Sequence, residues 1–258
     1  MWRGFSGGAI LQTKRARIYL DPANVLPHPG DRWTRFVCIS DTHDCTPAVP
    51  DGDVLLHAGD ISGGIPSRMK TMFEWLRGLP HQTKVVIAGN HDNWKIGGFM
   101  GRMGFTDEVF DELQEVVRGE DTRKSRVHYL EYESLEVEVR GKAAARHSFG
   151  AFQYETKDEA ADIYSKIPDD TEILLTHTPA EHILDETKRE VRAGCGVLAE
   201  RLKELVWCRL HVFGHIHEAR GAEIGEGGNV HVNAAIGSRM GGNPVVVDLL
   251  NSLEVDSA

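Results

Sequence analysis

Short apolar runs, most of them rich in β-branched side chains, recur along the chain and stop at polar or glycine residues. The five clearest runs cover residues 35–41, 53–60, 84–92, 172–178 and 209–217. Runs of this length and composition are typical of strands that are buried on both faces. The segments 126–140 and 229–249 have a similar composition, and we expect them to form further strands.

Amphipathic segments with helical spacing lie between several of these runs. They cover residues 66–80, 106–119, 156–168 and 196–206. The first has a proline near its first turn and stops before Pro80, and the third opens with Thr156 and Glu159 at capping-box spacing. Strands that alternate with helices predict an α/β fold in which helices pack on a sheet. In such sheets, ligands bind beyond the carboxyl ends of the strands.

The chain contains no internal repeat, low-complexity tract or linker, so we expect a single domain over residues 1–258. Its 41% hydrophobic and 26% charged residues suit a globular protein with a substantial core. Residues 1–34 lack a periodic pattern and contain Pro22, Pro27 and Pro29. This composition predicts an irregular N-terminal arm.

Net charge and cysteine content exclude some classes of function and argue for others. A formal net charge of −10 argues against a surface that coats nucleic acid, although a local cleft could still bind a small phosphorylated substrate. The sequence shows neither a signal peptide nor an apolar run long enough to span a membrane, so we expect a cytoplasmic protein without a membrane partner. The four cysteines lack zinc-site spacing, and Cys38 and Cys208 are expected to be buried free thiols.

Each of the five clearest runs ends in side chains that can bind a metal ion. These side chains are Asp41 and His43, Asp60, Asn90 with His91 and Asp92, His177, and His215 with His217. Carboxylate, amide and imidazole donors without thiolate suit borderline ions such as Mn²⁺, Fe²⁺/³⁺ or Zn²⁺. The set is too large for one tetrahedral ion. It fits two ions about 3.5–4 Å apart that share a carboxylate and a water molecule.

The local spacing of these donors supports a shared site. Asp41 and His43, like His215 and His217, are two residues apart, and in an extended chain such pairs project to the same side. A glycine precedes Asp60, Asn90 and His215 and permits a sharp turn there. Each motif alone is more often a turn or a surface feature than a ligand. Their joint occurrence at strand ends predicts a dinuclear metal site.

The ordered series DTH, GD, GNHD, TH and GHIH resembles the calcineurin-like metallophosphoesterase superfamily over roughly residues 35–249. The stretches GDVLLHAGDIS, LLTHTP and LHVFGHIHE are similar to a narrower branch of it. That branch includes the metallophosphoesterase-domain-containing brain proteins and class III cyclic-nucleotide phosphodiesterases. The resemblance implies an α/β/β/α fold: a double β-sheet sandwich flanked by helices, with a dinuclear metal site at the carboxyl ends of the strands.

The resemblance also implies a role for each site residue. One ion would be held by Asp41, His43 and His217, the other by Asn90, His177 and His215, and Asp60 would bridge them. His91 would lie outside the ligand set, near the leaving-group oxygen. As a separate hypothesis of mechanism, we expect His91 to be the catalytic residue and Asp92 to orient it. Some members of the branch carry glycine at the position of His215 and are poor catalysts, so the ligand set here is complete. Two divalent ions are therefore the expected cofactors, with Mn²⁺ favoured.

These expectations describe a hydrolase, and within that class a metal-dependent phosphodiesterase that acts on small phosphodiester or nucleotide-like substrates. A hydroxide that bridges the ions would attack phosphorus, and His91 would protonate the leaving group. Two alternatives stay open. One is a phosphomonoesterase, including a protein phosphatase, and the other is a nucleotide-binding regulatory protein with little turnover.

Several residues outside this set can be interpreted from their surroundings. His57, His211 and His231 lie in apolar runs and are predicted to be packed, hydrogen-bonded strand residues. His147 and His182 are candidates for lining the substrate cleft.

Two segments bear on substrate recognition. Residues 233–239, NAAIGSR, resemble an asparagine–glycine–serine loop of the superfamily, and Arg239 is a candidate partner for a phosphate. Residues 141–154, GKAAARHSFGAFQY, match the narrower branch poorly, which predicts an altered substrate preference.

Overall fold

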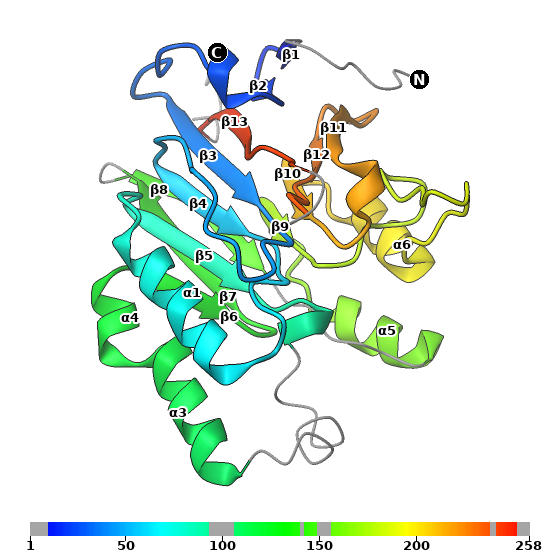
Figure 1. Cartoon of the computed structure of the whole chain (residues 1–258). Helices are drawn as coiled ribbons and strands as arrows, with labels where there is room; N and C mark the ends of the chain where they lie inside the picture. The colour runs from blue at the N-terminus through cyan, green and yellow to red at the C-terminus, as the bar shows by residue number, and fades with distance from the viewer. Residues whose placement is uncertain (1–9, 93–105, 140–141, 149–155, 238–240, 252–258) are drawn as a thin grey trace.

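A computed structural model describes residues 10–92, 106–139, 142–148, 156–237 and 241–251, and these segments form two β-sheets that pack face to face (Figure 1). The first sheet contains, in spatial order, β1 (Ile10–Gln12), β2 (Ala16–Tyr19), β13 (Val245–Leu250), β3 (Trp33–Ile39), β4 (Val54–His57), β5 (Thr83–Ile87) and β6 (Val127–Leu130). The second contains β11 (Gly221–Ile224), β12 (Val230–Asn233), β10 (Leu210–Phe213), β9 (Ile173–Leu175), β8 (Lys142–Ser148) and β7 (Ser134–Val139).

Helices cover the outer face of each sheet. The first sheet is covered by α1 (Pro66–Gly78), α3 (Asp107–Arg118) and α4 (Glu120–Lys124), and the second by α5 (Lys157–Ser165) and α6 (Gly196–Glu204) (Figure 1). The predicted capping box of α5 is present, because Thr156 accepts from the Glu159 amide and the Glu159 carboxylate accepts from the Thr156 amide. The layer order is therefore α/β/β/α, as the sequence resemblance implies.

The two-residue period of the strands creates separate cores on the two faces of each sheet. In β3, Phe36 and Cys38 contact the apolar core between the sheets, whereas Val37 and Ile39 contact Phe73 and its neighbours beneath the helices. Strands buried on both faces cannot alternate between apolar and polar residues, which explains the continuous apolar runs of the sequence. Cys38 and Cys208 are buried free thiols, as predicted.

The strands that carry the candidate ligands run in parallel. In the first sheet β3, β4 and β5 are parallel neighbours, and in the second β9 and β10 are parallel neighbours. The two sheets meet just beyond these strands, where Ser40 forms an isolated parallel bridge with Ala235. All five ligand-bearing loops therefore leave their sheets at the same edge of the sandwich.

The prediction of an irregular arm over residues 1–34 is wrong for part of that segment. Residues 10–12 and 16–19 form β1 and β2, which extend the first sheet by antiparallel pairing with β13. A buried ion pair anchors this region: the Arg35 guanidinium donates to both oxygens of Asp248, at 2.6 and 2.8 Å, and the Tyr19 hydroxyl donates to the same carboxylate at 3.2 Å. The local sequence pattern does not predict these strands, because they are short and β2 joins the sheet only by pairing with β13 from the other end of the chain.

Within the part of the chain that the structure describes, the helices are too short and too polar to cross a lipid bilayer.

Replacing Asp248 with asparagine should destabilise the fold strongly. The Arg35 guanidinium would then be a buried charge without its counterion, which typically costs about 3–5 kcal/mol of the free energy of unfolding. Urea unfolding followed by circular dichroism measures this loss. The control is Glu120→Gln, which breaks the exposed Lys124–Glu120 pair and should change stability by less than about 0.5 kcal/mol. Equal effects of the two substitutions would show that Asp248 has no special structural role.

Candidate metal centre

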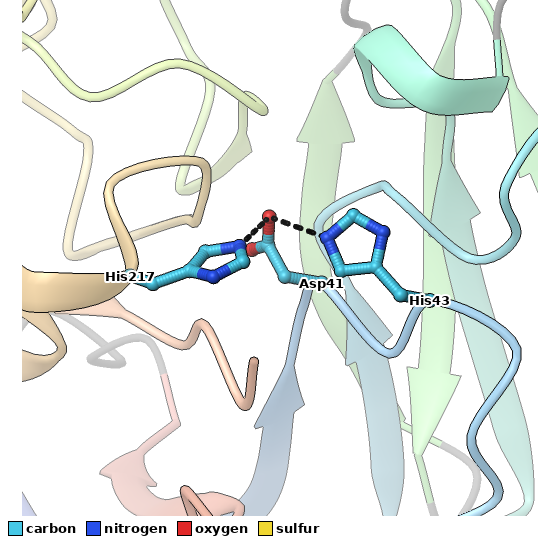
Figure 2. A group of neighbouring side chains, drawn as sticks. All are labelled: Asp41, His43 and His217. Atoms are coloured by element: carbon cyan, nitrogen blue, oxygen red, sulfur yellow. Dashed lines mark hydrogen bonds and ion pairs between the residues drawn. The ribbon is translucent and has the colours of Figure 1, made fainter. Parts of the chain in front are cut away.

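Three of the predicted ligands form a compact group at the ends of β3 and β10. The Nε2 atom of His217 lies 3.1 Å from Oδ1 of Asp41, and the Nε2 atom of His43 lies 4.0 Å from the same oxygen (Figure 2). Figure 2 shows the two rings on opposite sides of the carboxylate, with their nitrogens turned toward it. Asp41 itself is fully buried. The structure thus brings Asp41, His43 and His217 together.

The other three predicted ligands form a second group. Oδ1 of Asn90 lies 3.0 Å from Nε2 of His177 and 2.9 Å from Nδ1 of His215. Asn90 is part of a short 3-10 helix, η2 (Asn90–Asp92), that follows β5, whereas the two histidines follow strands of the second sheet. Each sheet therefore contributes to this group, as it does to the first.

Asp60 lies between the two groups. Its Oδ2 atom is 3.8 Å from Nε2 of His43 in the first group and 3.4 Å from Nε2 of His177 in the second. Its Oδ1 atom accepts a hydrogen bond from the backbone amide of His91 at 2.8 Å. One carboxylate within reach of both groups is the arrangement that a bridging ligand requires.

The donor set fits a pair of divalent ions. Three sets of three side chains, Asp41–His43–His217, His43–Asp60–His91 and Asp41–Asp60–His177, each place their donor atoms within 4.8 Å of one another. Donor atoms from different loops lie about as far apart as ligands of one ion do: Nε2 of His217 is 3.1 Å from Oδ1 of Asp41, and Nε2 of His177 is 3.0 Å from Oδ1 of Asn90. The chemistry of the set, oxygen and imidazole nitrogen without thiolate, matches borderline divalent ions.

The charges of the site also favour bound cations. Burial raises the pKa of Asp41, but the hydrogen bond from His217 and the nearby His177 outweigh it and lower this pKa to about 2. Burial lowers the pKa of His177, yet the charge of Asp60 and its hydrogen bond raise it to about 9. Burial raises the pKa of Asp60 as well, but His177 outweighs it and lowers this pKa. Both carboxylates are thus kept ionised although they are buried, and unpaired buried negative charge is costly. Positive charge is therefore needed beside them.

The backbone at four of the candidate ligands is held in an unusual conformation. Asp41, His43, Asp60 and His215 have φ angles of 56°, 43°, 52° and 67°, in the left-handed region that side chains other than glycine rarely adopt. This conformation costs roughly 1–2 kcal/mol per residue, so the surrounding contacts must impose it.

The predicted glycines allow the loops to approach closely. A Cβ at Gly89 would collide with the Asp60 carboxylate, and a Cβ at Gly214 would collide with that of Asp41. Gly59 has a φ of 97°.

His91 lies beside this cluster at the protein surface. Its side chain is 54% exposed, its Nε2 atom is 3.9 Å from Oδ2 of Asp60, and its ring meets that of His43 edge to face at 4.9 Å. The expectation that Asp92 orients His91 is not supported. The buried Asp92 carboxylate instead accepts hydrogen bonds from the backbone amides of Ile61, Ser62 and Gly89, at 2.9–3.0 Å. Asp92 thereby ties the loop after β4 to the loop after β5.

The histidines set aside by the sequence analysis behave as predicted. His57, His211 and His231 are buried and hydrogen-bonded. Sequence reasoning missed their partners Thr42 and Thr176, each adjacent to a predicted ligand. Of the predicted loop over residues 233–239, Ser238 and Arg239 lie outside the described residues, as does the side chain of His147.

Comparisons with known proteins agree with this geometry. A family model for calcineurin-like phosphoesterases matches residues 34–219, a span that contains every candidate ligand. Metallophosphoesterase domain-containing protein 1 of Homo sapiens is 33% identical over 243 residues, which cover 87% of this chain and 74% of that protein. A UPF0046 protein of Caenorhabditis elegans is 33% identical over 224 residues, which cover 82% of this chain and 73% of that protein.

A solved structure shares the fold. It is that of a phosphopantetheinyl hydrolase from Mycobacterium tuberculosis, which aligns with a TM-score of 0.53 at 15% sequence identity and covers 78% of this chain and 89% of its own. The family model spans most of the chain, the human relative exceeds 30% identity over most of both proteins, and the two-sheet fold and its ligand groups agree with both. The chain therefore belongs to the calcineurin-like phosphoesterase family.

Proposed function

We propose that this metal-dependent phosphoesterase is a phosphodiesterase for small, nucleotide-like substrates and that it works with two Mn²⁺ ions. The observation that carries the proposal is the position of Asp60 between two complete groups of donors. Asp41, His43 and His217 would hold one ion, Asn90, His177 and His215 the other, and Asp60 both. When bound, such a pair supplies a water of lowered pKa and positive charge for the phosphoryl oxygens.

The protein residues provide the remaining steps. The buried carboxylates Asp41 and Asp60 would hold the positive charge of the ions at the strand ends, and the phosphate of a substrate would be drawn to the same place. His91 is 54% exposed and its Nε2 atom is 3.9 Å from Oδ2 of Asp60, so a substrate that arrives from solvent can contact it. A protonated His91 can donate a proton to the oxygen that leaves phosphorus, which matters most when that oxygen belongs to a poorly leaving alkoxide.

The exposed His91 favours this reaction over its alternatives. A diester with an alkyl leaving group gains most from a proton donor outside the ligand set. Mn²⁺ is proposed because it accepts mixed carboxylate, amide and imidazole ligands. A small, nucleotide-like substrate is proposed because the stretches GDVLLHAGDIS, LLTHTP and LHVFGHIHE resemble a branch that includes class III cyclic-nucleotide phosphodiesterases.

Hydrolysis of bis-p-nitrophenyl phosphate and p-nitrophenyl phosphate tests the proposal. With Mn²⁺, the diester should be hydrolysed faster than the monoester, and EDTA should abolish both reactions. Cleavage of the monoester alone would make the protein a phosphomonoesterase. Tight nucleotide binding without cleavage of either ester would make it a regulatory protein.

Substitution of Asp60 with alanine should remove metal more completely than the loss of any other single ligand. Both ions lose a donor at once, so the content measured by elemental analysis should fall from two ions per chain toward zero. The matched control is Asp185→Ala, because Asp185 is equally buried but lies outside both donor groups. Retention of two ions in the Asp60 variant would refute the bridging role.

Substitution of His91 with alanine should leave metal content unchanged and slow the cleavage of alkyl phosphodiesters by about 10²–10⁴-fold, the usual contribution of a general acid. Aryl diesters should be affected much less, because a nitrophenolate leaves without a proton. Steady-state kcat values for the two ester classes provide the measurement. An equal loss on both classes would exclude proton donation by His91.

A further inference from the structure

Two buried histidines lie beside the ligand loops without being part of the donor groups. His57 is the last residue of β4, and its Nε2 atom lies 3.0 Å from the hydroxyl oxygen of Thr42, which stands between the ligands Asp41 and His43. His211 in β10 repeats this arrangement in the second sheet. Its Nε2 atom lies 2.9 Å from the hydroxyl oxygen of Thr176, which directly precedes the ligand His177. Both histidines are 0% exposed.

The hydrogen-bond partners define the direction of each interaction in the first pair. The Thr42 hydroxyl donates its single hydrogen to the carbonyl of Ile61 at 3.1 Å, so its oxygen accepts from Nε2–H of His57. The Nδ1 atom of His57 then accepts from the backbone amide of Gly59 at 3.3 Å. One neutral imidazole thus contacts the loop that follows β3 and the loop that carries Asp60.

The second pair extends into a longer chain of hydrogen bonds. The Thr176 hydroxyl donates to the carbonyl of Thr178 at 2.7 Å and accepts from Nε2–H of His211. His211 accepts at Nδ1 from Nδ1–H of His231, at 3.4 Å, and His231 accepts at Nε2 from the amide of Asn229, at 2.9 Å. Each ring donates once and accepts once, so every donor and acceptor in the chain is satisfied.

This pattern requires all three histidines to be neutral, and their environment ensures it. Burial lowers the pKa of His57 and His231 to about 4. Burial, together with the neighbouring His231, lowers the pKa of His211 well below its ordinary value.

From these contacts we infer that the His57–Thr42 and His211–Thr176 pairs are positioning elements, one in each sheet, that hold the ligand loops in place before metal binds. The inference rests on the proposed metal centre and adds to it. The loops of the first sheet need such support because Asp41, His43 and Asp60 have left-handed backbone conformations, which persist only where surrounding contacts impose them. The buried hydroxyl of Thr42 sits among all three and bonds across to the Asp60 loop.

Threonine-to-valine substitutions test the inference, because they remove the hydroxyl and keep the shape. Hydrogen–deuterium exchange in EDTA reports on the loops without metal. Thr42→Val should speed exchange in residues 41–44 and 58–62 and leave 176–179 unchanged, and Thr176→Val should show the reverse pattern. Thr122→Val is the matched control. Thr122 is 0% exposed and donates to the carbonyl of Val116 at 2.7 Å, outside both ligand loops. This control should leave both sets of peptides unchanged.

Titration with Mn²⁺ provides the second readout. Thr42→Val and Thr176→Val should each bind Mn²⁺ about tenfold more weakly, the usual effect of removing a group that orients ligands. Thr122→Val should bind as the wild type does, even if it unfolds at a lower temperature. His57→Gln, which keeps an N–H donor near the position of Nε2, should retain more affinity than His57→Asn, whose side chain is too short to reach Thr42.

The outcomes separate this inference from the proposed function. If the wild type binds two Mn²⁺ ions and the Thr42 and Thr176 variants match it in both exchange and affinity, the positioning role is overturned and the metal centre stands. The positioning role is also overturned if Thr122→Val weakens Mn²⁺ binding equally. If the wild type binds no pair of ions, the proposed metal centre fails and the positioning role fails with it.

Discussion

The structure depends on the burial of two carboxylates at the edge where its sheets meet. Asp41 and Asp60 are 0% and 2% exposed, and both are held close to histidines from the opposite sheet. Buried negative charge is unfavourable unless positive charge lies beside it. Without metal, the raised pKa of His177 partly meets this need. A pair of divalent cations would meet it fully, and the same cations would supply the chemistry of a phosphoesterase.

The fold creates this situation through topology. Parallel strands end at a common edge, so the loops after β3, β4 and β5 arrive together, and those after β9 and β10 arrive from the other sheet. Asp92 links the loops after β4 and β5 by accepting from their backbone amides. The buried His57 and His211 each form a hydrogen bond with a threonine hydroxyl in a loop that carries candidate ligands. The polar network lies beside the candidate ligands, whereas the cores between the sheets and their helices are apolar. The ligand conformations are therefore imposed by the protein scaffold.

Much of this organisation could be predicted from the sequence. Continuous apolar runs identify strands buried on both faces, and the polar residues that end each run identify the candidate ligands. Both can be recognised from the sequence because each pattern lies within one short segment. The α/β/β/α layering and the family are confirmed, and the two ligand groups come together as the resemblance implied. The domain count and the individual role of each ligand stay predictions.

Other features depend on contacts between distant residues and could not be read from local patterns. β1 and β2 exist because β13 pairs with them from the far end of the chain. Asp92 was expected beside His91, yet its carboxylate finds three backbone amides instead, because the amides of loop residues do not appear in a sequence pattern. The left-handed conformations at Asp41, His43 and Asp60 are likewise invisible in the sequence, since these residue types give no signal of the kind that glycine does.

Anomalous diffraction from crystals grown with Mn²⁺ would reveal directly whether Asp60 joins two ions. We expect two anomalous peaks about 3.5–4 Å apart at the carboxyl ends of the strands, with the Asp60 carboxylate between them. A single peak, or two peaks in separate cavities that do not share Asp60, would contradict this expectation.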